Sequence, residues 1–310
     1  MENLKIHFLN TVWSDAIILE SNNKYAFIDT GSLFYYPMIK NHLQEYNINT
    51  IEFILLTHFH SDHYGNVINL LKDKKVNKLY IKRYYGLDGT TAKGYTSNEE
   101  YTQHELMTFY QILDTAKEFN TEVIFVDELG LETLNITFDC HTLELYDIQN
   151  TVYKLYCEKD SPYYQQKAFN ENYSSIGVFI KVNDKHIFLG SDVTCSKTNA
   201  IELQERAITM INKHYQKYHI NHIDIYKSCH HGGGGTNTLE LCKLLNPDYA
   251  IITNTDQWLD NWPTIPNLKE ANNNVKVLKS DHQKYIFNMD EKITYQEIKE
   301  ESLFITLQKK

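Results

Sequence analysis

Short apolar runs separated by turn residues fill the first 60 positions of the chain. Their length and spacing predict several strands, and periodic apolar residues predict a single helix near Pro37–Tyr46. The predicted strands are Lys5–Asn10, Asp15–Glu20, Tyr25–Asp29 and Phe53–Leu56. The chain therefore begins with strands that are joined tightly, before any long helix.

The remainder of the pattern alternates between strands and helices. Ser97 and Glu100 form a capping box that opens a long helix with one apolar face. Further helices are predicted at Asn66–Lys72, Ile201–Tyr218 and Leu239–Leu245. Further strands are predicted at Leu79–Lys82, Glu122–Val126, Ile176–Val182, His186–Gly190, Ile223–Tyr226 and Tyr249–Thr253. This order predicts two sheets with helices outside them.

Composition narrows the class of protein. The 310 residues carry 30 basic and 40 acidic side chains without any basic block, which disfavours broad adhesion to nucleic acid or anionic membranes. The first residues lack the apolar region of a signal peptide, and no apolar run approaches the ~20 residues that span a bilayer. The five cysteines have no CxxC spacing, which predicts reduced thiols in a cytoplasmic protein.

The stretch "LLTHFHSDHYGN", residues 55–66, follows a buried strand and is dense in metal-type ligands. In an extended segment, residues i and i+2 point the same way, so His58 and His60 can present two imidazoles to one ion. If a helix then begins, Asp62 and His63 lie close by and can reach a second ion. Imidazole and carboxylate ligands suit Zn²⁺, with Mn²⁺ or Fe²⁺ as alternatives. The site would hold one or two ions.

Two later stretches deliver polar residues at strand ends in the same way. "HIFLGSD" is a buried strand that ends on Asp192, and "IDIYKSCHHGG" is one that ends on His230 and His231. An aspartate that bridges two cations holds them ~3.5–4 Å apart. Together with the first stretch, these residues predict a metal centre.

The motifs "FIDTG", "THFHSDHYGN", "FLGSD" and "HHGG" resemble, in order and separation, those of the metallo-β-lactamase superfamily. That resemblance implies an α/β fold, the αββα four-layer sandwich of metal-dependent hydrolases. Within the superfamily, the chain is similar to the hydrolase domain of ComEC-type competence (DNA-uptake) proteins. "NENYSSIGVFI" matches there, with Asn172 and Ser175 where most of the superfamily has its third-motif histidine, and Lys227 precedes the doubled histidine. The likeness predicts a hydrolase domain over residues 1–290 and an extension of uncertain structure over 291–310.

The chain also departs from this pattern. The typical "GQGD" turn is "TVWSD" here, and "HHGS" has become "HHGGGGTNT", so that Thr236 or Thr238 would have to replace the serine. No channel domain is present in the sequence, so DNA import is not implied.

The resemblance implies a first metal held by His58, His60 and Asp192. Asn172, His141 or His186 could replace the missing histidine, although His141 reads as a surface residue and His186 as structural. A single-metal enzyme remains an alternative.

The second metal would be held by Asp62, His63, Asp192 and one of the doubled histidines. We expect His230 to be that ligand and His231 to orient substrate or protonate the leaving group, with the opposite assignment open. Asp62 could also orient the attacking hydroxide, and Asp29 resembles the aspartate that fixes the histidine loop.

These features predict a phosphodiesterase or nuclease that uses a metal-activated hydroxide on a small molecule, a nucleotide or a short nucleic-acid strand. Lys227 and the bare backbone of Gly232–Gly235 could approach a phosphate. The alternative is a hydrolase of a small carboxylic ester, lactone or thioester. A third hypothesis is an inactive metal-binding protein that acts through partners.

Overall fold

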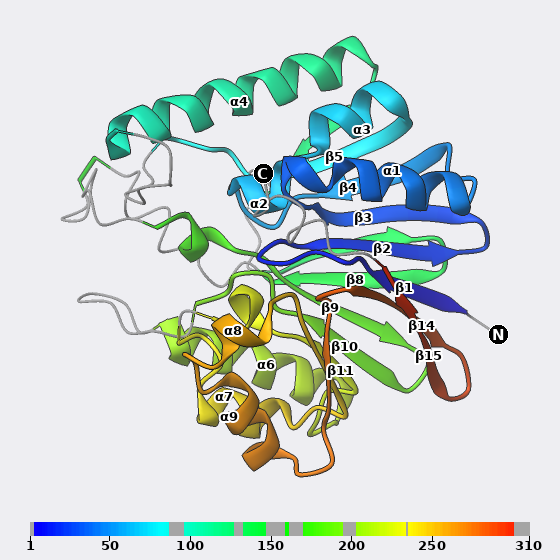
Figure 1. Cartoon of the computed structure of the whole chain (residues 1–310), viewed down its shortest axis with the longest axis vertical. Helices are drawn as coiled ribbons and strands as arrows, with labels where there is room; N and C mark the ends of the chain where they lie inside the picture. The colour runs from blue at the N-terminus through cyan, green and yellow to red at the C-terminus, as the bar shows by residue number, and fades with distance from the viewer. Residues whose placement is uncertain are drawn as a thin grey trace.

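Two facing sheets form the centre of the molecule (Figure 1). The computed structural model describes residues 3–86, 96–126, 133–146, 159–160, 170–194, 203–233 and 235–300. The eight-stranded first sheet contains, in spatial order, β15 (Ile293–Lys299), β14 (Gln283–Met289), β1 (Leu4–Phe8), β2 (Ala16–Ser21), β3 (Lys24–Thr30), β4 (Thr50–Leu55), β5 (Lys75–Ile81) and β6 (Glu122–Phe125). Strands β3 to β6 are parallel to one another, and the others pair antiparallel.

The second sheet, with seven strands among the described residues, also combines parallel and antiparallel strands. Its spatial order is β13 (Lys276–Lys279), β12 (Tyr249–Ile252), β11 (Ile225–Lys227), β10 (Lys185–Leu189), β9 (Gly177–Val182), β8 (His141–Tyr146) and β7 (Thr133–Phe138). Strands β10 to β13 are parallel, which brings the carboxyl ends of β10, β11 and β12 to one edge. The loops after these strands therefore meet at that edge.

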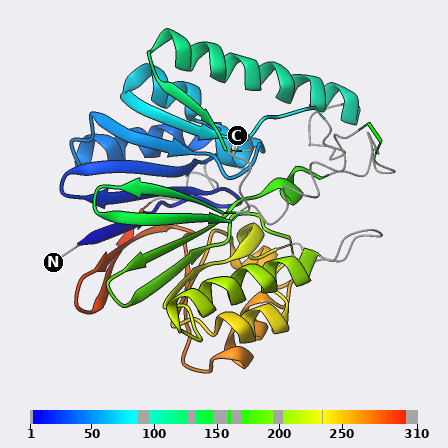
Figure 2. The same ribbon diagram turned by 180° about the vertical axis from the view of Figure 1, so that it is seen from behind.

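Helices cover the outer face of each sheet, as Figures 1 and 2 show from opposite sides. The first sheet is covered by α1 (Tyr36–Glu45), α3 (Val67–Asp73) and α4 (Asn98–Glu118). The second sheet is covered by α6 (Leu203–Tyr218), α7 (Leu239–Leu245) and α9 (Thr264–Ala271). The short helices are η1 (Leu33–Tyr35), α2 (Ser61–Tyr64), η3 (Glu171–Ser174), η4 (Cys229–Gly232) and α8 (Asp256–Leu259). The predicted αββα sandwich is confirmed.

Among the described residues, three apolar clusters hold these four layers together. One lies between the sheets and includes Phe8, Phe53, Val178 and Phe287, each no more than 3% exposed. The other two lie between each sheet and its own helices. A sheet buried on both faces needs apolar side chains at successive positions, which is why strands such as "AFI" and "FIL" read as continuous apolar runs.

The sequence pattern predicted the early strands and the capped helix α4 correctly, but it missed others. Ser97 Oγ accepts a hydrogen bond from the Glu100 backbone N–H, as the capping box requires. The hairpin β7–β8 and the strands β13 to β15 were not predicted. Strand β15 pairs with β14 over seven residues, which brings the chain up to Lys299 into the first sheet. The last ten residues lie outside the described ranges.

His141 was expected at the surface, and that expectation is wrong. It begins β8, is 1% exposed, and lies with its Nε2 3.3 Å from the Ser21 hydroxyl. Across the described ranges, no helix combines the length and apolar character needed to cross a membrane.

Glu144 links β8 to α6 in the second half of the sandwich. Its carboxylate contacts His214 Nδ1 at 3.1 Å and Lys217 Nζ at 2.5 Å, and it accepts hydrogen bonds from Tyr218 and Tyr146. Burial favours the protonated form, but hydrogen bonds from His214, Lys217 and Tyr218 prevail and lower the pKa of Glu144 to about 2.

We predict that Glu144→Gln destabilises the protein by about 1–3 kcal/mol, because the buried donors His214 and Tyr146 lose a charged acceptor. The folded state has the lower pKa, so the difference from wild type is full above the ordinary value of 4.5 and is lost as the pH falls toward 2. Urea unfolding of both proteins at several pH values measures this difference in the free energy of unfolding. Glu122→Gln, whose carboxylate is 63% exposed, is the control and should stay within about 0.5 kcal/mol. Equal stability of the Glu144→Gln variant and wild type at pH 7 would contradict the prediction.

Candidate metal centre

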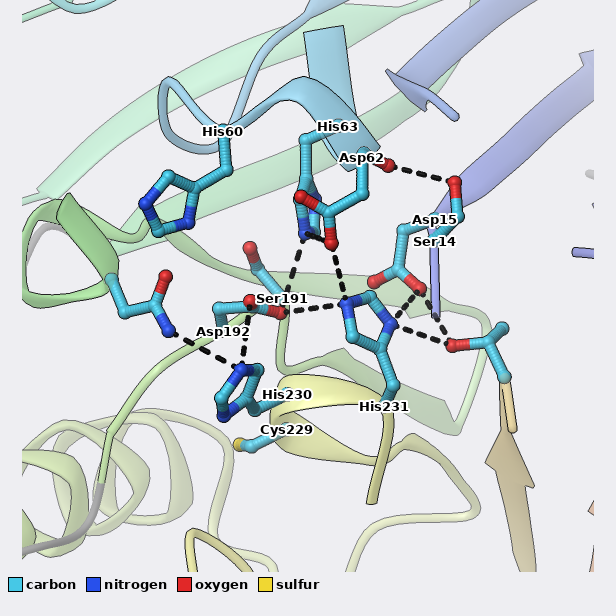
Figure 3. Close-up of polar contacts among 12 residues, drawn as sticks. Ser14, Asp15, His60, Asp62, His63, Ser191, Asp192, Cys229, His230 and His231 are labelled. Atoms are coloured by element: carbon cyan, nitrogen blue, oxygen red, sulfur yellow. Dashed lines mark hydrogen bonds and ion pairs between the residues drawn. The ribbon is translucent and has the colours of Figure 1, made fainter. Parts of the chain in front are cut away.

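Loops that follow strands of both sheets bring the candidate ligands together (Figure 3). His58 and His60 lie between β4 and α2, and Asp62 and His63 lie within α2. Asp192 follows β10, and the two histidines at 230 and 231 lie in η4, directly after β11. Parallel pairing of β10 with β11 places these last two loops side by side. The structure thus brings all seven predicted side chains to one edge of the sandwich.

Four of these side chains converge around one point, which we call the second metal position. Its donor atoms are Asp62 Oδ2, His63 Nε2, Asp192 Oδ1 and His231 Nε2. His231 Nε2 lies 3.1 Å from Asp62 Oδ2 and 3.5 Å from Asp192 Oδ1, and His63 Nε2 lies 3.6 and 3.4 Å from the same two oxygens. Ligands at about 2.0–2.1 Å from a tetrahedral zinc are separated by roughly 3.3 Å, so the spacing fits such an ion.

A second group forms what we call the first metal position. Its donor atoms are His58 Nε2, His60 Nδ1 and Asp192 Oδ2. The two nitrogens are 3.1 Å apart, and His58 Nε2 is 3.7 Å from Asp192 Oδ2. The two positions therefore lie on opposite oxygens of one carboxylate.

Unsatisfied polar atoms indicate that this centre fits a cation. His63 Nε2 and Asp192 Oδ1 are buried and have no hydrogen-bond partner within the described ranges, although they are only 3.4 Å apart. Buried polar atoms are otherwise almost always paired. Imidazole and carboxylate donors suit Zn²⁺, Mn²⁺ or Fe²⁺, so the residues could hold a divalent metal on each side of Asp192.

The expected ligand of the second metal position among the doubled histidines is corrected by this geometry. His231, rather than His230, faces Asp62 and His63, which corrects the preferred assignment in favour of its alternative. The reason is the backbone: both residues have left-handed conformations, with φ of 48° and 52°, and this turns the ring of the second one toward α2. Sequence distance from the strand end did not reveal that turn.

Two buried carboxylates orient the histidines of the second metal position. Asp29 Oδ2 is 2.8 Å from His63 Nδ1, and Asp15 Oδ1 is 3.1 Å from His231 Nδ1. Each contact leaves Nε2 of its histidine directed at the centre and fixes the ring orientation. Asp29 also accepts hydrogen bonds from the backbone and hydroxyl of Thr57, which anchors the loop that carries His58. This is the role that the resemblance implied for Asp29.

Asp15 was given no role from the sequence, although it ends the "TVWSD" turn. The lysine that was expected to face a phosphate, Lys227, is instead fully buried and lies 2.8 Å from Asp15 Oδ2. Burial raises the pKa of Asp15, but Lys227 and His231 outweigh burial and hold that pKa well below its ordinary value. Lys227 thus supports Asp15 and offers no charge to a substrate.

The glycine-rich turn also has a structural role. Gly232 has φ of 82°, and a Cβ there would lie 2.8 Å from Ile252, so the close packing requires glycine. The N–H of Gly233 donates to the carbonyl of His230, so it is already used within the turn. Thr236 is 1% exposed and donates to backbone carbonyls, while Thr238 caps α7. Within the described ranges, neither threonine presents its hydroxyl to the centre.

The three candidate replacements for the missing histidine, namely His186, His141 and Asn172, lie in different parts of the structure. His186 Nδ1 contacts His214 Nε2 at 3.0 Å, in the buried network of Glu144, which agrees with a structural role. His141 lies at the far hairpin beside Ser21. Asn172 lies at the centre, with its Nδ2 3.4 Å from His230 Nε2.

Comparison with known proteins agrees with the fold. Residues 14–149 match the family model described as the metallo-beta-lactamase superfamily. No curated protein matches the chain. The metallo-beta-lactamase fold protein YhfI from Bacillus subtilis aligns over 93% of this chain and 100% of its own, with a TM-score of 0.54 and 11% identity. The subclass B3 enzyme BJP-1 of Bradyrhizobium japonicum aligns over 69% of this chain and 70% of its own, with a TM-score of 0.38 and 16% identity.

The chain is therefore a metallo-β-lactamase-fold protein, and this is the fold of a superfamily of metal-dependent hydrolases. The narrower likeness to ComEC-type hydrolases rests on the sequence motifs alone.

We predict that Asp192→Asn weakens metal binding at both positions by at least about 100-fold, which exceeds the loss typical of a residue that only supports a ligand. The reason is that each oxygen of Asp192 faces one position. Calorimetric titration of apoprotein with Zn²⁺ and Mn²⁺ measures the affinities, and circular dichroism checks the fold. Asp184→Asn, with its exposed carboxylate in the turn between β9 and β10, is the control and should bind as wild type does. Unchanged affinity in Asp192→Asn would rule out this centre.

Proposed function

We propose that this protein is a metal-dependent phosphodiesterase or nuclease that acts on nucleotides or short nucleic-acid strands. The observation that carries the proposal is the pair of histidine nitrogens near each oxygen of Asp192. His58 and His230 lie 3.7 Å from Oδ2, and His63 and His231 lie 3.4 and 3.5 Å from Oδ1. Two divalent cations, when bound, supply Lewis acidity to a water nucleophile and to the phosphoryl oxygens.

Asp62 is the residue of this centre best placed to orient the attacking water. Its side chain is 29% exposed, whereas that of Asp192 is 2% exposed. Its backbone carbonyl accepts hydrogen bonds from the Ser14 hydroxyl and the Asp15 N–H, so the residue is fixed while one face of its carboxylate meets solvent. A carboxylate held in this way can accept a hydrogen bond from water and direct the water's lone pair at phosphorus.

Aromatic side chains border the loop that carries His231, and they favour a nucleotide. Trp13 packs edge-on against Trp258, with the ring centroids 4.4 Å apart, and the Trp13 indole N–H donates to Asn254 Oδ1. Asn254 in turn donates to the backbone carbonyl of His231. Trp258 is 46% exposed and Trp262 is 38% exposed. Exposed aromatic faces next to a metal centre can stack nucleobases, which contributes about 1–3 kcal/mol per base.

A carboxylic ester, lactone or thioester is the second candidate substrate class. The observation in its favour is the exposure of Leu33 and Phe34 in η1, at 63% and 39%. The backbone of this turn packs closely against Gly65 at the end of α2. An apolar acyl group could contact these side chains, so the choice between the two substrate classes rests on a direct assay.

We predict that the metal-loaded protein cleaves phosphodiesters faster than carboxylic esters or lactones. A phosphoryl transition state spreads negative charge over several oxygens, which a pair of cations stabilises more than the single oxyanion of an ester. The assay compares bis-p-nitrophenyl phosphate, single- and double-stranded DNA, RNA, p-nitrophenyl acetate and a lactone, each with Zn²⁺ or Mn²⁺. Ready opening of the lactone with no phosphodiester cleavage would reject the proposal in favour of the second class.

We also predict that Asp62→Asn lowers kcat by ~10²–10³, the usual cost of removing one electrostatic contact from an active site. The amide keeps the size of the side chain but loses the charge that faces water and the second metal position. Asp184→Asn again serves as the control. Turnover within a factor of two of wild type, at saturating metal, would show that Asp62 has no catalytic role.

A further inference from the structure

We infer that His230 is a ligand of the first metal position and supplies the imidazole that the chain lacks at residue 172. The first metal position has three mutually close donors, His58 Nε2, His60 Nδ1 and Asp192 Oδ2. His230 lies just outside this group, so its ring must turn toward the ion to become the fourth donor. A zinc site needs four donors, of which one can be water. A third imidazole would make this position as rich in protein ligands as the second.

The side of Asp192 on which His230 lies carries the assignment. His230 Nε2 is 3.7 Å from Asp192 Oδ2, the same oxygen and the same distance as His58 Nε2. His231 Nε2 instead approaches Oδ1, at 3.5 Å. Figure 3 shows Asp62, His63 and His231 above and to the right of Asp192, with His230 below Asp192 and His60 at the upper left. The doubled histidine is thus divided between the two metal positions.

The backbone of η4 is held in the conformation that produces this division. His230 and His231 have φ of 48° and 52°, a left-handed conformation that is strained for residues other than glycine. The His230 N–H donates to the Ser191 carbonyl at 2.7 Å, and its own carbonyl accepts from Gly233 at 2.8 Å. Two consecutive left-handed residues separate the ring centroids by 5.9 Å. Strain of this kind persists where the surrounding structure enforces it, typically at functional sites.

Asn172 marks the same location from the opposite loop. Its Nδ2 is 3.4 Å from His230 Nε2, and its backbone N–H is fixed by Asn170 Oδ1 at 2.9 Å. An imidazole binds zinc better than an amide does, because nitrogen donors of this kind suit the borderline-soft ion. His230 therefore reaches from η4 into the region that a histidine at residue 172 would occupy.

The inference rests on the metal-binding part of the proposed function and does not depend on the substrate. The test is equilibrium dialysis of the full chain against fixed free Zn²⁺ or Mn²⁺, with bound metal measured by mass spectrometry. Anomalous diffraction then locates each ion. Wild type, His230→Ala, His231→Ala and the double variant Asn172→His/His230→Ala are compared. His282→Ala, with a 48% exposed side chain in the turn before β14, is the matched control.

His230→Ala should bind one ion where wild type and the control bind two, with at least a ~100-fold loss of affinity at the first metal position. The remaining ion should lie between Asp62, His63 and His231, which also shows that the variant is folded. His231→Ala should lose the other ion, and Asn172→His should restore the second ion to His230→Ala.

Two bound ions of wild-type affinity in His230→Ala would overturn this inference alone, and so would loss of the ion beside His63 instead. Wild type that binds no metal would overturn the metal centre and the proposed function together. Phosphodiester inactivity with two ions bound would reject only the proposed substrate.

Discussion

The buried carboxylate of Asp192 is the constraint that joins the ligand loops of the two sheets at the metal centre. Asp192 follows β10 of the second sheet, whereas its partners His58 and His63 follow β4 of the first sheet. Hydrogen bonds from Ser191 Oγ to Thr57 Oγ1, at 2.6 Å, and from the Ile176 N–H to the Thr57 carbonyl hold the two loops together. A relative shift of the sheets by one residue, about 3.3 Å along a strand, would separate these donors.

The negative charge of Asp192 is buried and is compensated by neighbouring histidines. Asp15, Asp29 and Asp192 are each 1% exposed, and buried carboxylates are costly unless they are compensated. Burial lowers the pKa of His231, but Asp192 and Asp15 outweigh it and raise that pKa to about 9. The apoprotein therefore keeps a proton on His231 at neutral pH, and a cation at the second metal position must displace it. The same carboxylates that demand a counter-charge make this pocket favourable for a divalent metal.

Local sequence signals revealed the fold and most of the centre, and long-range relations account for the rest. The HxHxDH spacing and the apolar runs that end on Asp192 need only a few neighbouring residues to be interpreted. The contact of Asp15 with His231 spans 216 residues, so no local pattern indicates it. Lys227 was expected to approach a substrate phosphate, because the sequence alone does not show that its side chain is buried. The exposed strand β15 carries little apolar alternation, and it forms because β14 offers a free edge in register.

Dividing a doubled histidine between two metal positions links these positions through the backbone. If His230 and His231 hold different ions, a single peptide group connects them, and both residues are already in left-handed conformations. The hydrogen bonds of His230 with Ser191 and Gly233 already hold this peptide group, so both histidines are presented to the centre without reordering η4. A histidine supplied from residue 172 would provide no such link, because η3 and η4 are separate segments and no peptide group joins residue 172 to His231.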